Sequence, residues 1–277
     1  MQEKNNKVID KENNDKKPFV LSDKWKAVIL AFVLVAFFVI VIFSPAFSVK
    51  EINIQDSEYY TEEELLESFS QFKGKNGNIL LINNTKFSQA SGIFNRHLTV
   101  VEEQMLFDYP LIKNINIKYS APGTINVTLS DRKPVMMVDY FGTFLYVDTQ
   151  GYVLAVNSDG IDNNLPIVQG IDIDTYKVGT PLTLETNKKI DAAIKLCMVI
   201  SELSMNDYID IIDISNYNNI RMFCAPSLAI EFGSLENLKV RLSILKSVFD
   251  TGKDGYSNGT IDMTGGNTPV FKENITE

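Results

Sequence analysis

Few residues in this chain have side chains suited to catalysis. The 277 residues include one histidine, His97, and two cysteines, Cys197 and Cys224. His97 stands beside Arg96 in a polar stretch that we expect to be helical, and it has no partner at the spacing of a catalytic triad or a metal site. A solvated helix residue is the better interpretation. The two cysteines could form a disulfide or remain buried, inert thiols, and the sequence leaves both alternatives open.

The acidic residues are better explained by structure than by chemistry. Glu62, Glu63 and Glu64 fit the start of a helix, where negative charge is favourable. Asp172 and Asp174 alternate along a short extended stretch and could hold a cation, although two solvated carboxylates are the simpler interpretation. The chain contains no P-loop, His-Glu-x-x-His or Gly-x-Ser-x-Gly motif. We therefore predict no enzymatic activity, no cofactor and no metal site.

One uncharged run, Ala27 to Phe43, separates a lysine-rich start from the rest of the chain. As a helix this run would be about 25 Å long, and its continuation through Val49 exceeds the ~30 Å thickness of the membrane hydrocarbon. We predict a transmembrane helix over residues 25–46, anchored by Trp25, Ala27 and Phe43. A cleaved signal peptide is the alternative, since Ala46-Phe47-Ser48 offers small residues for cleavage, but the preceding segments are long for an export signal.

The distribution of charge predicts the orientation of this helix. The first 26 residues carry seven lysines and five acidic residues, which leaves 19 basic and 30 acidic residues for the remainder. The positive-inside bias then places the N-terminus in the cytoplasm and the larger part outside. The negative charge of that part argues against nucleic acid or anionic lipid as its main ligand. Residues 1–24 are too polar to fold and should form a disordered tail.

Hydrophobic periodicity predicts strands and helices in residues 47–132. Val49 to Gln55 alternates like a half-buried strand, and Thr61 with Glu64 forms a capping box at the start of a helix. A short apolar run over residues 78–82 follows, and a second helical stretch, interrupted near Ser91-Gly92, is expected from Lys86 to Asp108. Two alternating strands around a Pro122-Gly123 turn complete the segment.

Residues 133–264 favour a second, larger domain with a mainly antiparallel sheet. One helix is expected over residues 187–203, and another should begin at a cap on Ser234. We expect residues 265–277 to form a flexible tail. The predicted strands cover residues 135–138, 143–147, 152–156, 209–215, 220–223, 228–232 and 260–263.

The order strand, helix, helix, strand, strand after a membrane anchor resembles a POTRA domain. The phrase Asp131-Arg132-Lys133-Pro134-Val135 resembles the acid-Arg-x-Pro-hydrophobic junction of the FtsQ/DivIB family of cell-division proteins. The second POTRA helix is longer than the family pattern, with residues 91–97 as the extra part. Further phrases follow in the family's order, at Tyr146 to Val153, Leu165 to Gly170, Ile212 to Ser215, Glu231 to Gly233 and Thr260 to Met263.

The resemblance implies an α+β fold: one transmembrane helix, a POTRA domain (β-α-α-β-β), then the FtsQ/DivIB β domain with its helices on one face. It also implies a bitopic, non-enzymatic protein of the cell membrane at the division septum. Its partners would be FtsB/DivIC-like and FtsL-like division proteins, together with the septal peptidoglycan synthase complex.

Members of this family bind a partner strand at a sheet edge near the C-terminus, which is β-augmentation in physical terms. We expect the strand over residues 260–263 to be that edge. The residues alone are also consistent with a simpler interpretation, in which Asp262 and the tail cap the edge. The expected partner-binding residues are Lys239, Arg241, Tyr256, Thr260, Ile261, Asp262 and Met263.

Other classes of function fit less well. A one-span receptor would need an output domain that 26 polar residues cannot form. An outer-membrane assembly pore would need a long series of barrel strands after the POTRA module. A membrane-anchored extracytoplasmic receptor or a cell-wall-binding module remains the alternative to a division scaffold.

Overall fold

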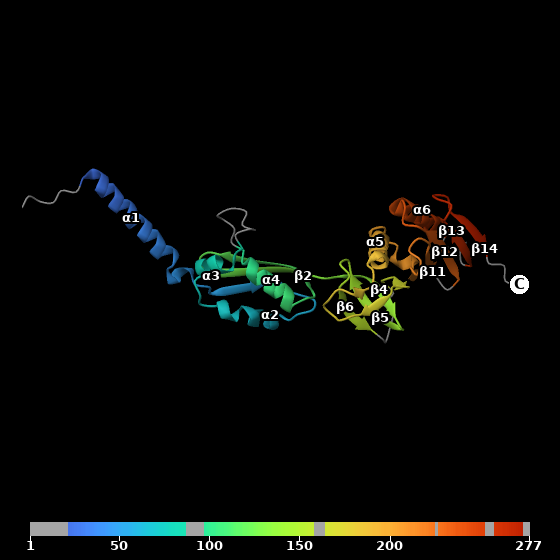
Figure 1. Ribbon diagram of the computed structural model, residues 1–277, viewed down its shortest axis with the longest axis horizontal. Helices are drawn as coiled ribbons and strands as arrows, with labels where there is room; N and C mark the ends of the chain where they lie inside the picture. The colour runs from blue at the N-terminus through green and yellow to red at the C-terminus, as the bar shows by residue number, and fades with distance from the viewer. Residues whose placement is uncertain (1–21, 87–96, 158–163, 225–226, 253–257, 274–277) are drawn as a thin grey trace, which may run out of the picture.

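The computed structural model describes residues 22–86, 97–157, 164–224, 227–252 and 258–273. Its first element is the apolar helix α1 (Asp23–Ile42), and a short 3-10 turn η1 (Pro45–Phe47) follows it. Helix α1 is long and apolar enough to cross a membrane, and its residues are exposed to the surroundings rather than packed in a core. Two folded domains follow in line with the helix (Figure 1). The anchor prediction therefore coincides with a separate, unpacked apolar helix.

The first domain packs helices on a three-stranded sheet with the order β1-β3-β2. Strand β1 runs parallel to β3, and β2 pairs antiparallel with β3. The alternating residues of β2 and β3 send Ile115, Ile117, Ile125 and Val127 into the core. Its elements are β1 (Glu51–Ile54), α2 (Glu62–Phe69), η2 (Ser70–Phe72), α3 (Gly77–Asn84), α4 (Thr99–Asp108), β2 (Ile112–Ser120) and β3 (Thr124–Asp131).

The helices of this domain differ from the sequence-based prediction. The cap on α2 is confirmed, because the Thr61 hydroxyl accepts a hydrogen bond from the Glu64 N–H at 3.3 Å. The apolar run after residue 77 is a helix of its own, α3, which begins at Asn76 as its cap. Helix α4 begins at Thr99, and Lys86, His97 and Leu98 are not helical, so in the described residues the interrupted helical stretch predicted from Lys86 is confirmed only from Thr99 to Asp108. Residues 91–96 of the predicted extension lie outside the described residues.

The second domain contains a mixed sheet that is mostly antiparallel, with nine strands in the described residues. Its order is β14-β13-β12-β11-β10-β7-β4-β5-β6, and β8 and β9 form a small separate sheet. The strands are β4 (Pro134–Tyr140), β5 (Thr143–Asp148), β6 (Val153–Asn157), β7 (Ile167–Gln169), β8 (Ile173–Thr175), β9 (Thr183–Leu184), β10 (Ile211–Asp213), β11 (Ile220–Cys224), β12 (Leu228–Gly233), β13 (Gly259–Asp262) and β14 (Val270–Glu273).

Two helices, α5 (Lys188–Glu202) and α6 (Leu238–Thr251), lie on the same side of this sheet (Figure 1). Both bury an apolar stripe in the core, which includes Leu196 and Cys197 of α5 and Leu242 and Leu245 of α6. A short 3-10 turn, η4 (Asn206–Tyr208), follows α5. The α+β prediction with helices on one face is confirmed. Helix α6 begins after Asn237, which has a left-handed φ of 50°, so Ser234 is not its cap.

The two domains are joined through Arg132, directly after β3. Its side chain is 7% exposed, and Nη1 donates to Asp148 Oδ2 at 2.8 Å and to Gln150 Oε1 at 2.6 Å. Nε donates to the carbonyl oxygen of Pro110 in the first domain at 2.9 Å. The guanidinium also lies 3.5 Å from the centre of the Tyr152 ring. A single buried cation thus contacts both domains.

Candidate partner-binding edge of the sheet

The strand predicted to be the sheet edge lies one position further in. β13 pairs in parallel with β12 on one side and antiparallel with β14 on the other. The edge prediction for residues 260–263 is therefore wrong, and β14 ends the sheet in the described part of the chain. The expected flexible tail after Gly265 contains this strand. Because a strand with neighbours on both sides has its backbone groups paired, β13 cannot accept another strand without losing one.

The residues of β13 are consistent with an internal position. Ile261 is 1% exposed and Met263, which follows the strand, is completely buried. Thr260 is half-buried and lies opposite Lys272 in the register of β14. These side chains belong to the core and the pairing of the sheet, so they support the edge rather than form it.

Asp262 fastens β13 to β14. Its carboxylate accepts hydrogen bonds from the Thr264 hydroxyl at 2.6 Å and the Thr264 N–H at 3.0 Å. The Lys272 ammonium lies 2.9 Å from the other carboxylate oxygen. The Thr264 bonds and the Lys272 charge lower the pKa of Asp262 to about 2. The hypothesis that Asp262 caps the edge thus corresponds to a specific link between the last two strands.

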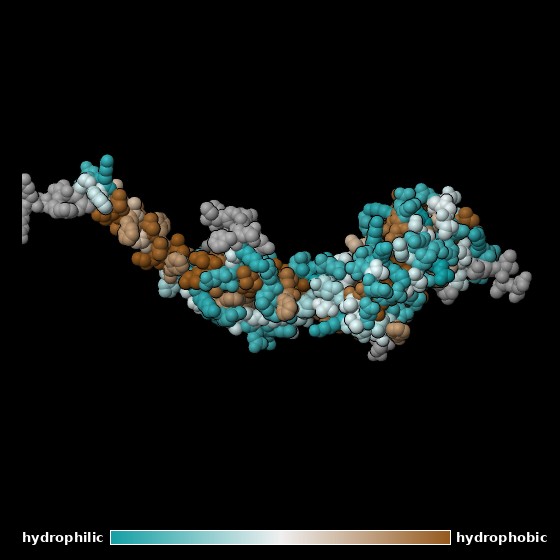
Figure 2. All heavy atoms as spheres, in the orientation of Figure 1, coloured by the Kyte–Doolittle hydropathy of each residue, from teal (hydrophilic) through white to brown (hydrophobic). Residues whose placement is uncertain are grey.

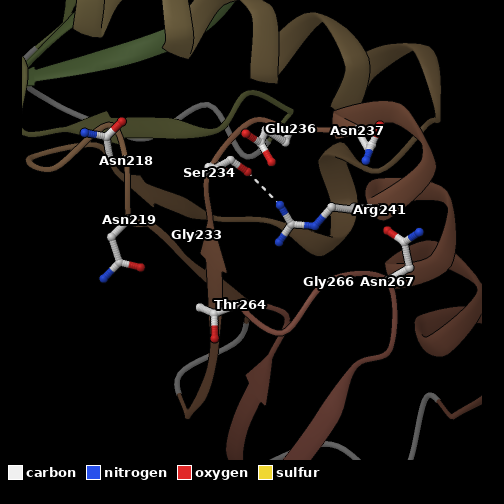
Figure 3. Close-up of a pocket in the computed structure, with 10 residues that line it drawn as sticks. All are labelled: Asn218, Asn219, Gly233, Ser234, Glu236, Asn237, Arg241, Thr264, Gly266 and Asn267. Atoms are coloured by element: carbon white, nitrogen blue, oxygen red, sulfur yellow. Dashed lines mark hydrogen bonds between the residues drawn. The ribbon is translucent and has the colours of Figure 1, made fainter.

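Arg241 does not lie on the exposed face of α6, as the sequence had suggested. It is 5% exposed, and its guanidinium points toward the ends of β12 and β13 (Figure 3). Nη1 donates to the Ser234 carbonyl at 2.6 Å, and Nη2 donates to the carbonyls of Phe232 and Met263. Burial lowers the pKa of Arg241, and Glu236 opposes this effect. This side chain therefore ties α6 to two neighbouring strands.

A shallow cavity of about 410 Å³ opens beside Arg241. Figure 3 shows polar side chains around its rim, including Asn218 and Asn219 from the loop before β11 and Asn267 from the loop before β14. The lining holds one acidic residue, Glu236, and the Arg241 guanidinium is already bonded to carbonyl oxygens. This arrangement provides hydrogen-bonding groups, and the described lining residues include no histidine, cysteine or lysine.

The outer face of α6 adds an exposed surface near the edge. Lys239 forms an ion pair with Glu202 at 2.5 Å, and both side chains are more than half exposed. Val240 is 53% exposed and lines a shallow groove of about 470 Å³ with Ser243 and Ile244. Tyr256, the remaining expected contact, lies outside the described residues.

The residues expected to anchor the chain in a membrane lie near the two ends of α1. Trp25 is 63% exposed and follows the start of the helix by two positions, while Phe43 comes directly after its last residue. Ala27 begins the apolar run and is exposed as well. These positions suit a helix surrounded by lipid.

The residues considered for chemistry lie apart from one another. His97 pairs with Lys118 in a β-bridge, and its Nδ1 lies 3.5 Å from Glu102 Oε1, so the predicted helical position is wrong. Cys197 and Cys224 are free and buried, and burial raises the pKa of each thiol to about 12. No group of three His, Cys, Asp or Glu side chains suited to a metal ion occurs in the described residues.

Sequence alone missed two features of this region, β14 and the burial of Arg241. A signal for β14 is present in retrospect, because Val270-Phe271 follows a Gly265-Gly266-Asn267 turn. Arg241 has no such signal. Its position on α6 is compatible with either face until the strand ends that it contacts are placed.

The fold defines the chain as a protein with one apolar N-terminal helix and two α+β domains, the second ending in an exposed strand. No family model matches it. Over 82% of its length it is similar to two cell division proteins called DivIB. The one from Clostridium acetobutylicum is 20% identical over 230 residues (83% of that protein), and the one from Clostridium tetani is 27% identical over 234 residues (80%). These similarities support the assignment of the chain to the FtsQ/DivIB family of cell-division proteins.

A third relative supports the same family. The cell division protein FtsQ of an Anaeromyxobacter species is 34% identical over 73 residues, which are 26% of this chain and 24% of that protein. The resemblance based on Asp131 to Val135 and the phrases after it is thereby confirmed. In the structure, this motif contains the arginine that joins the two domains.

Proposed function

We propose that this protein is a non-enzymatic bitopic scaffold of the division machinery. Its N-terminus lies in the cytoplasm and its two domains lie outside, at the division septum. There it binds FtsB/DivIC-like and FtsL-like membrane proteins and helps to recruit or regulate septal peptidoglycan synthesis. Two findings support this proposal: the similarity to division proteins, and an apolar N-terminal helix that precedes two folded domains.

The proposal depends mainly on one observation: β14 lies at the edge of the large sheet in the described residues. β14 pairs with β13 on one side and ends the described sheet on the other. Val270 is 52% exposed there, so the strand is accessible along its side chains. A partner segment that extends the sheet would gain main-chain hydrogen bonds from β14 and specificity from alternate side chains.

The neighbouring surface of α6 extends this proposed contact. Lys239 and Val240 are exposed on the helix that packs behind β12 and β13. Thr260 to Met263, in β13 and directly after it, would hold the neighbouring strand β14 in register. Of the predicted residues, Lys239 would thus belong to the contact surface, and Thr260 to Met263 would support that surface.

Membrane anchoring explains how modest contacts could suffice. Partners that share one membrane have a raised effective concentration, so several weak contacts add up to a stable assembly. A scaffold of this kind requires surfaces that other proteins can reach, and it requires no reacting groups.

The edge can be tested by site-specific cross-linking in living cells. A photoreactive phenylalanine analogue replaces Val270 on β14 in the full chain, and a matched control replaces Val156 on β6, the strand at the other end of the sheet. We expect cross-links to the DivIC-like partner from position 270 and none from position 156. Equal yields from both positions, or a partner cross-link from 156 alone, would contradict the proposed edge.

A further inference from the structure

The end of α1 is fastened to the first domain by two asparagines. Asn78 Nδ2 donates to the Ile42 carbonyl at 2.7 Å, and Asn76 Nδ2 donates to the Ser44 carbonyl at 3.0 Å. Asn76 is also the cap of α3, since its Oδ1 accepts from the N–H groups of Asn78 and Ile79. The start of α3 is therefore held directly against the end of the membrane helix.

An apolar surface continues from α1 onto this part of the domain. Ile79 and Ile82, three positions apart on α3, are 42% and 61% exposed, although Leu80 between them is buried. Phe43, at the end of α1, is 44% exposed. Figure 2 shows the hydrophobic colour of α1 extending onto the adjoining end of the first domain. Two isoleucines exposed on an eight-residue helix call for a partner surface.

The length of the apolar run brings this surface to the bilayer. Ala27 to Phe43 spans about 25 Å as a helix, so the ~30 Å hydrocarbon thickness is crossed only with the continuation toward Val49, the segment that Asn76 contacts at Ser44. A short apolar run is accommodated when residues at its ends are drawn toward the lipid. Since Asn76 and Asn78 hold α3 to the end of α1, α3 must lie at the same depth as that end.

The charges around this surface suit the headgroup region. Lys50, Lys73 and Lys75 are exposed within the segments that pair next to the end of the span, where the Val49 N–H donates to the Lys75 carbonyl at 2.9 Å. Lysines at such a position can reach lipid phosphates while apolar neighbours enter the interface. The local charge thus differs from the net negative charge of the whole chain.

We propose that α3 docks on the surface of the bilayer, with Ile79 and Ile82 in contact with lipid. The first domain would then be held in one orientation on the membrane, and its distal end would direct the second domain away from it. The inference rests on the proposed anchoring of α1 and is independent of any protein partner. The competing occupant of the same surface is a second copy of this chain.

Site-specific fluorescence in lipid nanodiscs tests this contact. Three variants of the full chain, Ile82→Cys, Phe107→Cys and Phe43→Cys, each add one cysteine, which is labelled with an environment-sensitive dye. The buried thiols of Cys197 and Cys224 should not take up the dye in the native state. Phe107 is the matched control, because it is 82% exposed and lies close to the distal end that Pro110 marks. Phe43 reports on insertion of the span itself.

We expect lipid-borne quenchers to reduce the emission at position 82 at least twofold more than at position 107, with position 43 quenched as well. Quenching at 43 with equal values at 82 and 107 would overturn the docking of α3 while leaving the anchor intact. No quenching at 43 would overturn the anchor and with it this inference. If the difference in emission between positions 82 and 107 disappears when each disc holds one chain, the surface is covered by a second copy. That result would overturn lipid as its occupant.

Discussion

Two buried arginines hold this molecule together in different ways. Arg132, between the domains, has a carboxylate partner, Asp148, at 2.8 Å, and that partner is 1% exposed. Arg241, behind the last strands, is as well buried, but no carboxylate of the described residues lies within ion-pair distance. Its donors contact three carbonyl oxygens, and its guanidinium lies 4.3 Å from the centre of the Phe232 ring.

The comparison separates two uses of a buried cation. At Arg132, two opposite charges offset the cost of leaving water, so each depends on the other. At Arg241, backbone dipoles and an aromatic ring stabilise one charge, and burial lowers the pKa of the guanidinium. Loss of a partner should therefore be more damaging at the domain junction than loss of the arginine at the sheet end.

The largest effect is expected from Asp148→Ala. The substitution leaves Arg132 buried without its counter-charge and removes the acceptor for the N–H groups of Gln150 and Tyr152. We expect the free energy of unfolding to fall by about 3–5 kcal/mol. Urea titration of the full chain in detergent micelles, followed by circular dichroism, measures this change.

A double variant sharpens this prediction. Arg132→Met with Asp148→Leu removes both charges and should recover most of the lost stability. The exposed ion pair between Lys133 and Glu58, at 3.8 Å on the same junction, is the matched control. Its Lys133→Met variant should change stability by less than about 1 kcal/mol. If Lys133→Met lowered the free energy of unfolding as much as Asp148→Ala does, burial would not determine the cost of losing an ion-pair partner.

A smaller effect is expected from Arg241→Met. The variant leaves the carbonyls of Phe232, Ser234 and Met263 without their donor, but it also removes a charge that is costly to bury. We expect a loss of about 1–3 kcal/mol in the same titration. Arg241→Lys should not restore the wild-type value, because an ammonium lacks the planar fork that reaches three carbonyls. Lys239→Met, two positions away on the exposed side of α6, should lie within about 1 kcal/mol of wild type.

The smallest effect depends on pH and concerns the last two strands. The pKa of Asp262 in the folded protein, about 2, lies below its ordinary value of 3.8. The contribution of Asp262 is therefore complete above about pH 4 to 5 and is lost as the pH falls toward 2. The protection of the β14 amides from hydrogen exchange, taken relative to the intrinsic exchange rate at each pH, should decrease over this range in the wild type. The Asp262→Asn variant should show a smaller pH dependence there, and identical profiles would remove Asp262 from the link between β13 and β14.

Periodicity predicted the elements that have one buried face. The alternation around Ile117 and Val127 matched β2 and β3, and the stripe in residues 187–203 matched α5. These predictions worked because a strand or helix with one face in the core must repeat its apolar residues at the period of its backbone. Helix α1 was predicted for a related reason, since it is apolar on all sides from Ala27 onward.

The prediction failed where short elements depend on distant neighbours. α3 and β14 are eight and four residues long, too short to show a clear period. β14 exists as a strand because β13 offers it a partner, and Asp262 with Lys272 fixes the pairing. The position of the sheet edge, and with it the candidate contact surface, could not be read before that pairing was known.

The sequence by itself predicted the apolar helix α1, the order of the elements after it and the resemblance to the family, because each is written in local composition or in the order of short phrases. Only the tertiary structure decided which strand ends the sheet, that Arg241 is buried, and that Arg132 joins the domains. These properties depend on which residues far apart in the chain meet, and a buried charge or an open strand is defined by its neighbours in space.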